Sequence, residues 1–198
     1  DVHTAVASRT WGIDPSEVTK ELRNRAKMVA YGLAYGMEAY GLAQRLGPPV
    51  EEAAEILESY FTAFPAIRAY MDRTVAEARQ KGYTETLFGR RRRIPELSSS
   101  NYNVRLAAER QAMNAGIQGL AADVFKVALI RIDRSLRESG CGSILVLQVH
   151  DEVILEVPPD KLSEVEAMVR SVMTGAYELR VELAVEVAVG ATWADAKG

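Results

Sequence analysis

The chain has 198 residues, of which 48% are hydrophobic and 26% charged, a composition typical of a globular protein with ample material for a core. Its net charge of −3 excludes a uniformly basic nucleic-acid binder, although residues 1–110 hold 16 Lys and Arg against 14 Asp and Glu, and residues 111–198 hold 8 against 13. Cys141 is the only cysteine, which excludes an intrachain disulfide, and without a long apolar run we expect a cytoplasmic protein that does not contact a membrane.

The first half of the chain has the pattern of several helices. It begins with Asp1 rather than Met and reads as though already inside a folded segment, so we expect a fragment of a longer protein. Residues 14–17 form a capping-box-like start for a short helix. Apolar residues at helical spacing predict further helices over residues 20–35, 51–64 and 66–81, with another short one ending at Gly47.

The second half mixes strands and helices. Alternation predicts a strand over residues 83–88, and four consecutive arginines at residues 90–93 follow it. They form either a solvated loop or a site for backbone phosphates. The best linker candidate runs through residues 95–100. Beyond it we expect a helix over residues 103–139, interrupted or bent near its two glycines, then a hairpin, a helix over residues 160–174 and a strand over residues 183–189, giving an α+β architecture of two subdomains.

A row of basic and aromatic side chains lies along the helix expected at residues 20–35. Arg23, Lys27 and Tyr31 stand at i, i+4 and i+8, on one face, and Tyr35 extends the row. At about 1.5 Å per residue the row from Arg23 to Tyr31 spans roughly 12 Å, which suits a nucleoside triphosphate lying along the helix. The cations would contact phosphates and the ring the sugar or base. The alternative is a solvated basic face with Tyr31 in the core.

Two glycines in the same segment disfavour a helix. Gly32 and Gly36 each follow a tyrosine, and each costs about 1 kcal/mol of helix stability relative to alanine. This cost indicates that something approaches the backbone closely at these positions.

The segment ILVLQVHDEVILEV, residues 144–157, predicts a β-hairpin with His150, Asp151 and Glu152 at its bend. We expect at least one face of this apolar hairpin to be buried. Ionised carboxylates in such surroundings are costly unless they are paired or bind a cation, so the adjacent acids favour a divalent metal. The alternative is a solvated turn, because hairpin tips often carry acids.

Several strings resemble, in the right order, the motifs of one protein family. RNRAKMVAYGLAYG is similar to the fingers-helix motif of family A DNA polymerases, the bacterial DNA polymerase I group, and LQVHDEV is similar to that family's carboxylate motif at the end of the palm. The resemblance continues through ETLFGRRRRIPE, ERQAMNAGIQGLAADVFK and VGATWADAK, and covers essentially all of the chain. It implies a right-hand polymerase fold without the thumb, with mostly helical fingers at residues 1–97 and part of a palm of sheet and helix at residues 98–198.

The resemblance also implies roles for individual residues. His3, Arg23 and Lys27 would hold the triphosphate, with Lys27 also neutralising charge during catalysis, and Tyr31 would pack against the incoming nucleotide. The residues implied in DNA contact are Tyr35 at the templating position, Arg110, Asn114 and Gln118 along one helical row facing the minor groove, and His150 near the primer end. For that row the alternative is an ordinary polar helix face. Minor-groove contacts suit a copying enzyme because their acceptors are nearly the same for all base pairs.

The implied reaction is template-directed DNA synthesis by two-metal phosphoryl transfer, in replication and repair, on primer-template DNA and deoxynucleoside triphosphates. Asp151 would bind magnesium, and Glu152 less certainly because neighbouring residues of a strand diverge. Two ions need a second aspartate, which in this family precedes the present residue 1. We therefore expect a monomer whose 198 residues alone do not polymerise.

Two alternative functions are open to the sequence. One is a non-catalytic nucleic-acid-binding module, which would bind DNA without Mg²⁺ and without primer extension. The other is a metal-dependent phosphohydrolase built on the acids of the hairpin, which would hydrolyse nucleotides without a primer. A phosphohydrolase would leave the row of Arg23, Lys27 and Tyr31 without a role.

Overall fold

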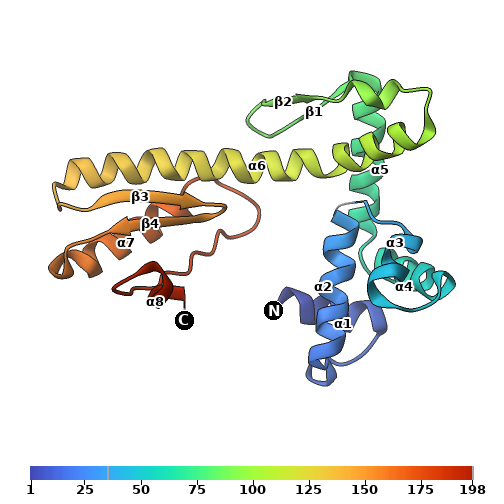
Figure 1. Ribbon diagram of the computed structural model, residues 1–198, viewed down its shortest axis with the longest axis horizontal. Coiled ribbons are helices and arrows are strands. Elements are labelled where there is room, and N and C mark those ends of the chain that lie inside the picture. The colour runs from blue at the N-terminus through green and yellow to red at the C-terminus, as the bar shows by residue number, and fades with distance from the viewer. Residues whose placement is uncertain (35, 198) are drawn as a thin grey trace. The chain divides into compact units, whose positions relative to one another are not determined.

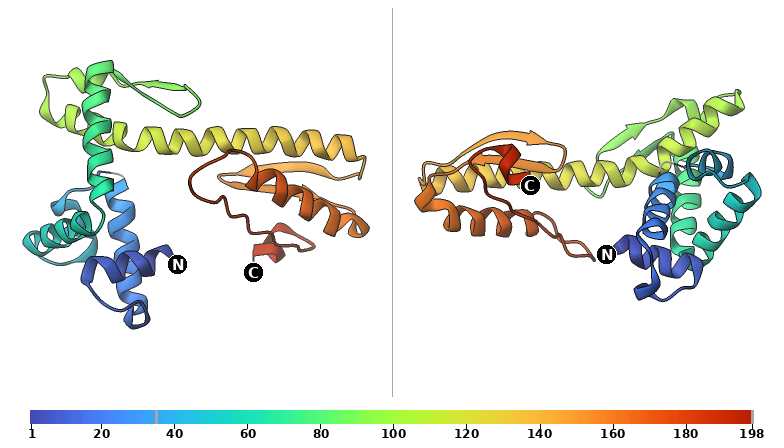
Figure 2. Two further views of the ribbon diagram at one scale, coloured as in Figure 1. Left: turned by 180° about the vertical axis from the view of Figure 1, so that it is seen from behind. Right: turned by 60° about the horizontal axis from the view of Figure 1, so that its bottom comes forward.

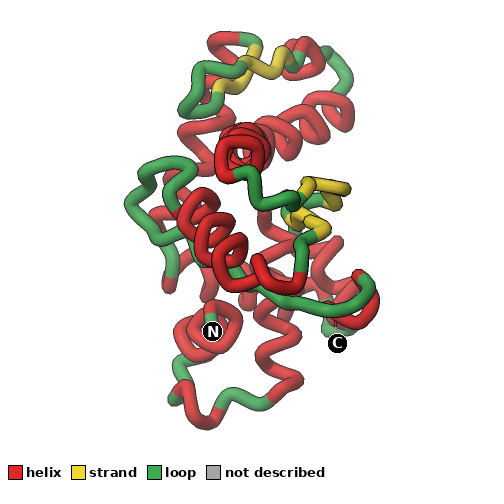
Figure 3. Tube along the Cα trace, turned by 90° about the vertical axis from the view of Figure 1, so that its left-hand side faces the viewer, coloured by secondary structure: helices red, strands yellow, loops and turns green. Residues whose placement is uncertain are grey.

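A computed structural model describes residues 1–34 and 36–197 of the chain (Figure 1). The chain divides into two compact units, Asp1–Gly119 and Leu120–Gly198. Helix dominates, and the strands of the described residues form two separate antiparallel hairpins (Figure 3), which confirms the α+β class. In the described part of the chain, no helix has the length and apolarity needed to cross a membrane.

The first unit contains a group of helices followed by a short hairpin. Its helical segments are α1 (Val2–Trp11), η1 (Pro15–Glu17), α2 (Lys20–Ala34), α3 (Ala39–Leu46), α4 (Val50–Ala63), α5 (Pro65–Lys81) and η2 (Pro95–Ser98). The hairpin pairs β1 (Tyr83–Glu85) with β2 (Arg91–Arg93). These bounds confirm the predicted helices to within a few residues and shorten the predicted strand. Helix α1 is an addition that the sequence pattern did not predict.

The core of the first unit sets the orientation of α2. Ala26, Val29 and Leu33, at helical spacing, are buried in a cluster with side chains of α1, α3 and α4. Figure 2 shows these helices gathered together. Burying about three such side chains supplies several kcal/mol of apolar stabilisation. Because this face of α2 points inward, its basic row points outward to solvent.

Close packing explains why glycine stands at positions 32 and 36, where it disfavours a helix. A Cβ built on Gly32 would lie 3.0 Å from the sulfur of Met37, and one built on Gly41 would lie 2.8 Å from the Cγ of Met37. Gly32 and Gly41 therefore leave room for Met37 between α2 and α3. At Gly36 the crowding comes instead from Arg110. The expectation of close approach to the backbone is confirmed at both Gly32 and Gly36.

Helix α6 (Tyr102–Ser139) crosses from the first unit into the second. It is one continuous helix, so of the expected interruption or bend near Gly116 and Gly119 the interruption is excluded. A Cβ on Gly119 would lie 2.6 Å from the methyl carbon of Thr86. The glycine there permits the β1–β2 hairpin to approach the helix, and its helix-weakening effect is outweighed by the length of the helix around it.

The second unit is built on the hairpin of β3 (Ile144–Val149) and β4 (Glu152–Glu156), with η3 (Pro159–Lys161), α7 (Leu162–Thr174) and α8 (Trp193–Lys197). Leu145, Val153 and Leu155 pack against a buried cluster formed by α6 and α7, which confirms a buried face. Ile144, Val146 and Leu147 are exposed instead. The pairing register shifts between Leu145 and Leu147.

The strand expected over residues 183–189 is absent, although its alternation is real. Of the alternate apolar residues, Leu183, Val185 and Val187 are half-buried while Ala184, Glu186 and Ala188 are exposed, but Val189 is exposed too. No neighbouring strand pairs with this segment among the described residues. Apolar alternation predicts which side chains face inward, whereas a strand also needs a hydrogen-bonding partner.

Candidate functional site

A cationic patch forms on the first unit where α1 meets the outer face of α2. It consists of His3, Arg23, Lys27 and Tyr31, and we call it the α2 patch. The His3 and Tyr31 ring centroids are 5.7 Å apart, and the Lys27 ammonium lies 5.8 Å from the centroid of the Tyr31 ring. Tyr31 is 52% exposed, so the alternative of a core tyrosine is wrong. The geometry places a flat ring next to three groups that can bind an anion.

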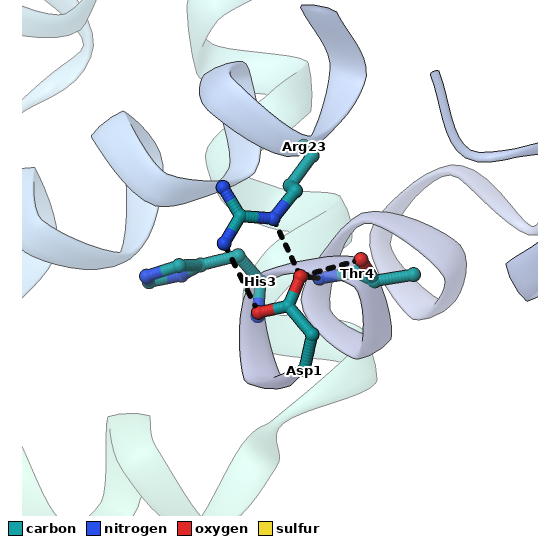
Figure 4. A network of polar contacts seen from close by, with 4 residues as sticks. All are labelled: Asp1, His3, Thr4 and Arg23. Carbon is teal, nitrogen blue, oxygen red and sulfur yellow. Dashed lines mark hydrogen bonds and ion pairs between the residues drawn. The ribbon is translucent and has the colours of Figure 1, made fainter. Parts of the chain in front are cut away.

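Asp1 organises the edge of the α2 patch (Figure 4). Its carboxylate caps α1 by accepting hydrogen bonds from the backbone N–H groups of His3 and Thr4. It also accepts from the Arg23 guanidinium, at 2.5 Å from Nε and 3.3 Å from Nη2. Both side chains are about 40% exposed, so this pair contributes at most about 1 kcal/mol. A phosphate can therefore compete with Asp1 for Arg23.

The sequence pattern missed Asp1 as a member of this arrangement. An aspartate immediately before a helix is a capping signal, but α1 has a weak apolar periodicity and was not predicted. The pairing of Asp1 with Arg23 joins residues 22 positions apart, and no local pattern indicates it.

His3 has a lowered pKa in the folded protein. Burial is the main cause, and the positive charges of Arg23 and Lys27 add to it, so the pKa lies below its ordinary value of 6.5. Its Nδ1 is buried without a hydrogen-bond partner among the described residues. Because the unfolded chain binds this proton more tightly, the stability that neutral His3 contributes is present above pH 6.5 and is lost as pH falls toward the folded pKa.

We predict that binding of a polyphosphate at the α2 patch raises the pKa of His3. The anion offsets the field of Arg23 and Lys27 and favours the imidazolium, so binding is accompanied by proton uptake. The measurement is an NMR pH titration of the His3 ring with and without a deoxynucleoside triphosphate, with His150→Gln used to assign the two histidines. A His3 pKa at or above 6.5 in the free protein, or one that the nucleotide leaves unchanged, contradicts this prediction.

A second polar surface lies on α6, at the part that belongs to the first unit. Arg110, Asn114 and Gln118 form the row expected from their spacing, and we call it the α6 row. None of the three makes a hydrogen bond or ion pair with another described residue. Their polar groups are thus available to a ligand. Tyr35, expected to stack at the templating position, lies outside the described residues.

An arginine-rich cavity adjoins the end of the α6 row. It has a volume of about 220 Å³ and is lined by Thr84, Thr86, Arg90, Arg91, Arg92, Ala115, Gln118 and Gly119. Arg90 donates to the carbonyl of Gly119 at 2.7 Å, and Arg91 pairs with Glu85. Arg92 and Arg93 are exposed and have no ion pair with a described residue. Arg90 thus holds the hairpin against α6, Arg91 is paired within the hairpin, and Arg92 and Arg93 are available to phosphates.

The tip of the β3–β4 hairpin is a two-residue loop, His150 and Asp151. His150 has a φ of 53°, the one positive φ found outside glycine in the described chain. Gln148 donates from Nε2 to the His150 carbonyl at 2.7 Å and stabilises the turn. Backbone conformations of this kind cost of order 1 kcal/mol and are concentrated at functional sites. At this position the two-residue hairpin turn itself calls for a positive φ.

The two acids at this tip have different surroundings. Asp151 is exposed and has no partner among the described residues. Glu152 is paired with the Lys197 ammonium at 3.2 Å, and that ammonium also lies 4.8 Å from the centroid of the Trp193 ring on α8. Asp151 is therefore free to bind a cation, whereas Glu152 must first leave Lys197. The sequence pattern gave no indication of the Lys197 contact.

A complete metal site is not formed by this part of the protein. Within residues 1–34 and 36–197, no three His, Cys, Asp or Glu side chains are grouped so that they could hold a metal ion. An exposed, unpaired carboxylate such as Asp151 suits Mg²⁺, which prefers oxygen ligands and binds through one or two carboxylates together with substrate phosphates. Asp151 thus fits as one ligand of a site that requires further groups.

Comparison with known proteins relates these surfaces to a family. The sequence profile of DNA polymerase family A matches residues 1–195. DNA polymerase I of Mycobacterium bovis is 52% identical over 98% of this chain, and the thermostable DNA polymerase I of Thermus filiformis is 48% identical over all of it. The chain spans only 21% and 23% of those two proteins.

A solved structure is similar along the whole chain. It is the polymerase domain of Pol1 from M. smegmatis in complex with DNA primer-template and dNTP, with a TM-score of 0.97 and 49% sequence identity. The match covers 100% of this chain and 35% of that one. The likeness is therefore one of sequence as well as of fold.

Proposed function

The chain belongs to DNA polymerase family A, and from that membership we propose that it forms part of a DNA-directed DNA polymerase. The observation that supports this most directly is the α2 patch, where His3, Arg23, Lys27 and Tyr31 come together from two helices. Three groups able to carry positive charge beside an aromatic ring suit a deoxynucleoside triphosphate. The proposed partners are that nucleotide and primer-template DNA, and the proposed setting is DNA replication and repair in the cytoplasm.

The proposed reaction joins the nucleotide to the primer. The primer 3′-oxygen forms a bond to the α-phosphorus, the bond from that phosphorus to the bridging oxygen breaks, and pyrophosphate leaves. Arg23 and Lys27 hold the leaving phosphates and offset the charge that develops on them. Tyr31 packs against the nucleotide. His3 adds a further phosphate contact, and its pKa is expected to rise when the phosphate binds.

Asp151 is the proposed magnesium ligand of this chain. When bound, Mg²⁺ stabilises the charge on the attacking and leaving oxygens. Because Glu152 is held by Lys197, we assign it the lesser role of a ligand that must be released first. The remaining carboxylate is proposed to come from a part of the polymerase outside these 198 residues. His150, which has a left-handed backbone conformation, is proposed to contact the primer end.

The α6 row and the arginines beside it are proposed to bind the primer-template. Arg110, Asn114 and Gln118 suit the minor groove, where hydrogen-bond acceptors vary little between base pairs. Arg92 and Arg93 suit backbone phosphates, which provide affinity without sequence information. Such a surface holds any sequence equally, as template-directed synthesis requires. The division into fingers at residues 1–97 and palm at residues 98–198 also stays a proposal.

Primer extension tests the proposed function. The polymerase that contains this chain is expected to extend a primer with Mg²⁺ and to stop when the metal is chelated, and the 198 residues alone are expected to give no extension. Extension by the 198 residues alone would show that they contain a complete site. Metal-independent DNA binding without any extension by the longer protein would favour a non-catalytic binding module. Nucleotide hydrolysis without a primer would favour a phosphohydrolase.

A further inference from the structure

Gly36 lies in the turn that ends α2. The N–H of Gly36 donates to the carbonyl of Leu33 at 2.7 Å, and the N–H of Met37 donates to the carbonyl of Gly32 at 2.8 Å. These two bonds are those of a Schellman motif, in which the residue at the position of Gly36 takes a left-handed conformation. Its φ of 67° agrees. Glycine adopts this conformation without steric cost, which gives one reason for its presence.

A second reason is independent of the backbone conformation. A Cβ built on Gly36 would overlap the Cγ of Arg110 and would lie 2.9 Å from its Cβ and Cδ. These atoms are the base of the arginine side chain: the Cβ is fixed to α6, and the Cγ and Cδ could move away only if the side chain changed its rotamer. The backbone at Gly36 therefore forms a wall against the stem of Arg110.

Gly12 provides a contrast within the same unit. Its φ is 66°, and it ends α1 just as Gly36 follows α2. A Cβ built on Gly12 would meet no atom within 4 Å. The two glycines share their backbone conformation, and only Gly36 has a side chain pressed against it.

The stem of Arg110 is held, and its guanidinium has no polar partner within residues 1–34 and 36–197. Arg110 is half-buried and makes no hydrogen bond or ion pair with a described residue, while the preceding Glu109 pairs with Arg79. A long side chain whose stem is already ordered loses less conformational entropy on binding. The contact with Gly36 thus prepares the arginine for a ligand without occupying its charged group.

We propose that Gly36 is a positioning residue that acts through Arg110. By confining the arginine stem, it presents the guanidinium to the primer-template and joins the end of α2 to the α6 row. This inference rests on the proposed function, because it takes the α6 row as a DNA-binding surface. On this proposal, α2, which bears the nucleotide site, is coupled to the α6 row, which binds the duplex, through the contact between Gly36 and Arg110.

The test compares Gly36→Ala with Gly12→Ala in the polymerase that contains this chain. Both substitutions place a side chain at the same φ, so both lower the thermal unfolding temperature through backbone strain. Gly36→Ala is expected to weaken primer-template binding by about tenfold, in the range found for residues in contact, while Gly12→Ala changes it by less than about twofold. The readout is fluorescence anisotropy of a labelled primer-template. Equal weakening by the two variants would overturn the inference.

A double-mutant cycle identifies the route of the effect. Arg110→Ala removes the Cγ and Cδ that crowd Gly36, so Gly36→Ala is expected to have little further effect on DNA binding in that background. An undiminished effect there would show that Gly36 does not act through Arg110. In the double variant the contact with the Cβ at position 110 remains, but those with Cγ and Cδ are gone, so it is expected to be more stable than Gly36→Ala alone. A double variant no more stable than Gly36→Ala would contradict the proposed overlap. A parent protein without DNA binding or extension would overturn the proposed function itself.

Discussion

Replacing Asp151 by asparagine in the polymerase that contains this chain is expected to reduce primer extension by about 10³-fold or more. The side chain is exposed at the tip of the β3–β4 hairpin and has no partner among the described residues, so its charge is available to a cation. Losing a metal ligand forfeits several kcal/mol of transition-state stabilisation, and each 1.4 kcal/mol is about a tenfold change in rate. Single-turnover primer extension at saturating nucleotide measures the loss. Primer-template affinity is expected to change little.

Two variants serve as controls for this prediction. Asp160→Asn removes the same charge from an exposed position of the same unit and is expected to leave the rate within about twofold. Glu152→Gln is expected to have a smaller effect than Asp151→Asn, because Glu152 is paired with Lys197. If Glu152→Gln instead costs as much as Asp151→Asn, both acids bind metal and the Lys197 contact is replaced on binding. An active Asp151→Asn enzyme contradicts the assignment.

Replacing Lys27 by alanine is expected to lower kcat/KM for the nucleotide by about 10²-fold or more, the effect of losing one donor aimed at developing charge. Lys27 is exposed and makes no ion pair with a described residue, whereas Arg23 of the same patch is held by Asp1. Its ammonium is therefore the cation that a phosphate can bind without displacing a carboxylate. Lys27→Arg is expected to restore part of the activity.

Lys20→Ala is the matched control for this second prediction. Lys20 begins the same helix and is exposed, but it lies about two turns away from Lys27. It removes an identical charge outside the α2 patch, so kcat/KM is expected to stay within about twofold. An equal loss from both variants would indicate that the general positive field of the helix, and not a contact made by Lys27, attracts the nucleotide.

Local pattern predicted most of the helices and the hairpin. The apolar spacing of Ala26, Val29 and Leu33 determines which face of α2 is buried, and that face in turn determines that Arg23, Lys27 and Tyr31 point outward. The resemblance to a family then connected these residues with His3, which spacing alone does not do. When all the residues concerned lie on one helix, their spacing in the sequence is enough to predict which side chains are buried and which are exposed.

The contacts that the sequence could not predict join distant parts of the chain. The pairing of Asp1 with Arg23, that of Lys197 with Glu152 and the crowding of Gly36 by Arg110 all depend on how elements pack, and each partner looks ordinary in its own segment. The absent strand over residues 183–189 has the same origin, because strand formation depends on a neighbour that the segment itself does not reveal.

The continuity of α6 limits how this protein can be divided. The boundary between the two units falls inside the helix, 18 residues after its first residue. A truncation there would create two new helix ends, each with about four backbone groups lacking partners, in the middle of a cooperative segment. Cutting in the loop just before Tyr102 would leave the helix whole. For the design of chimeric polymerases, the start of α6 is therefore a better exchange point than the unit boundary after Gly119.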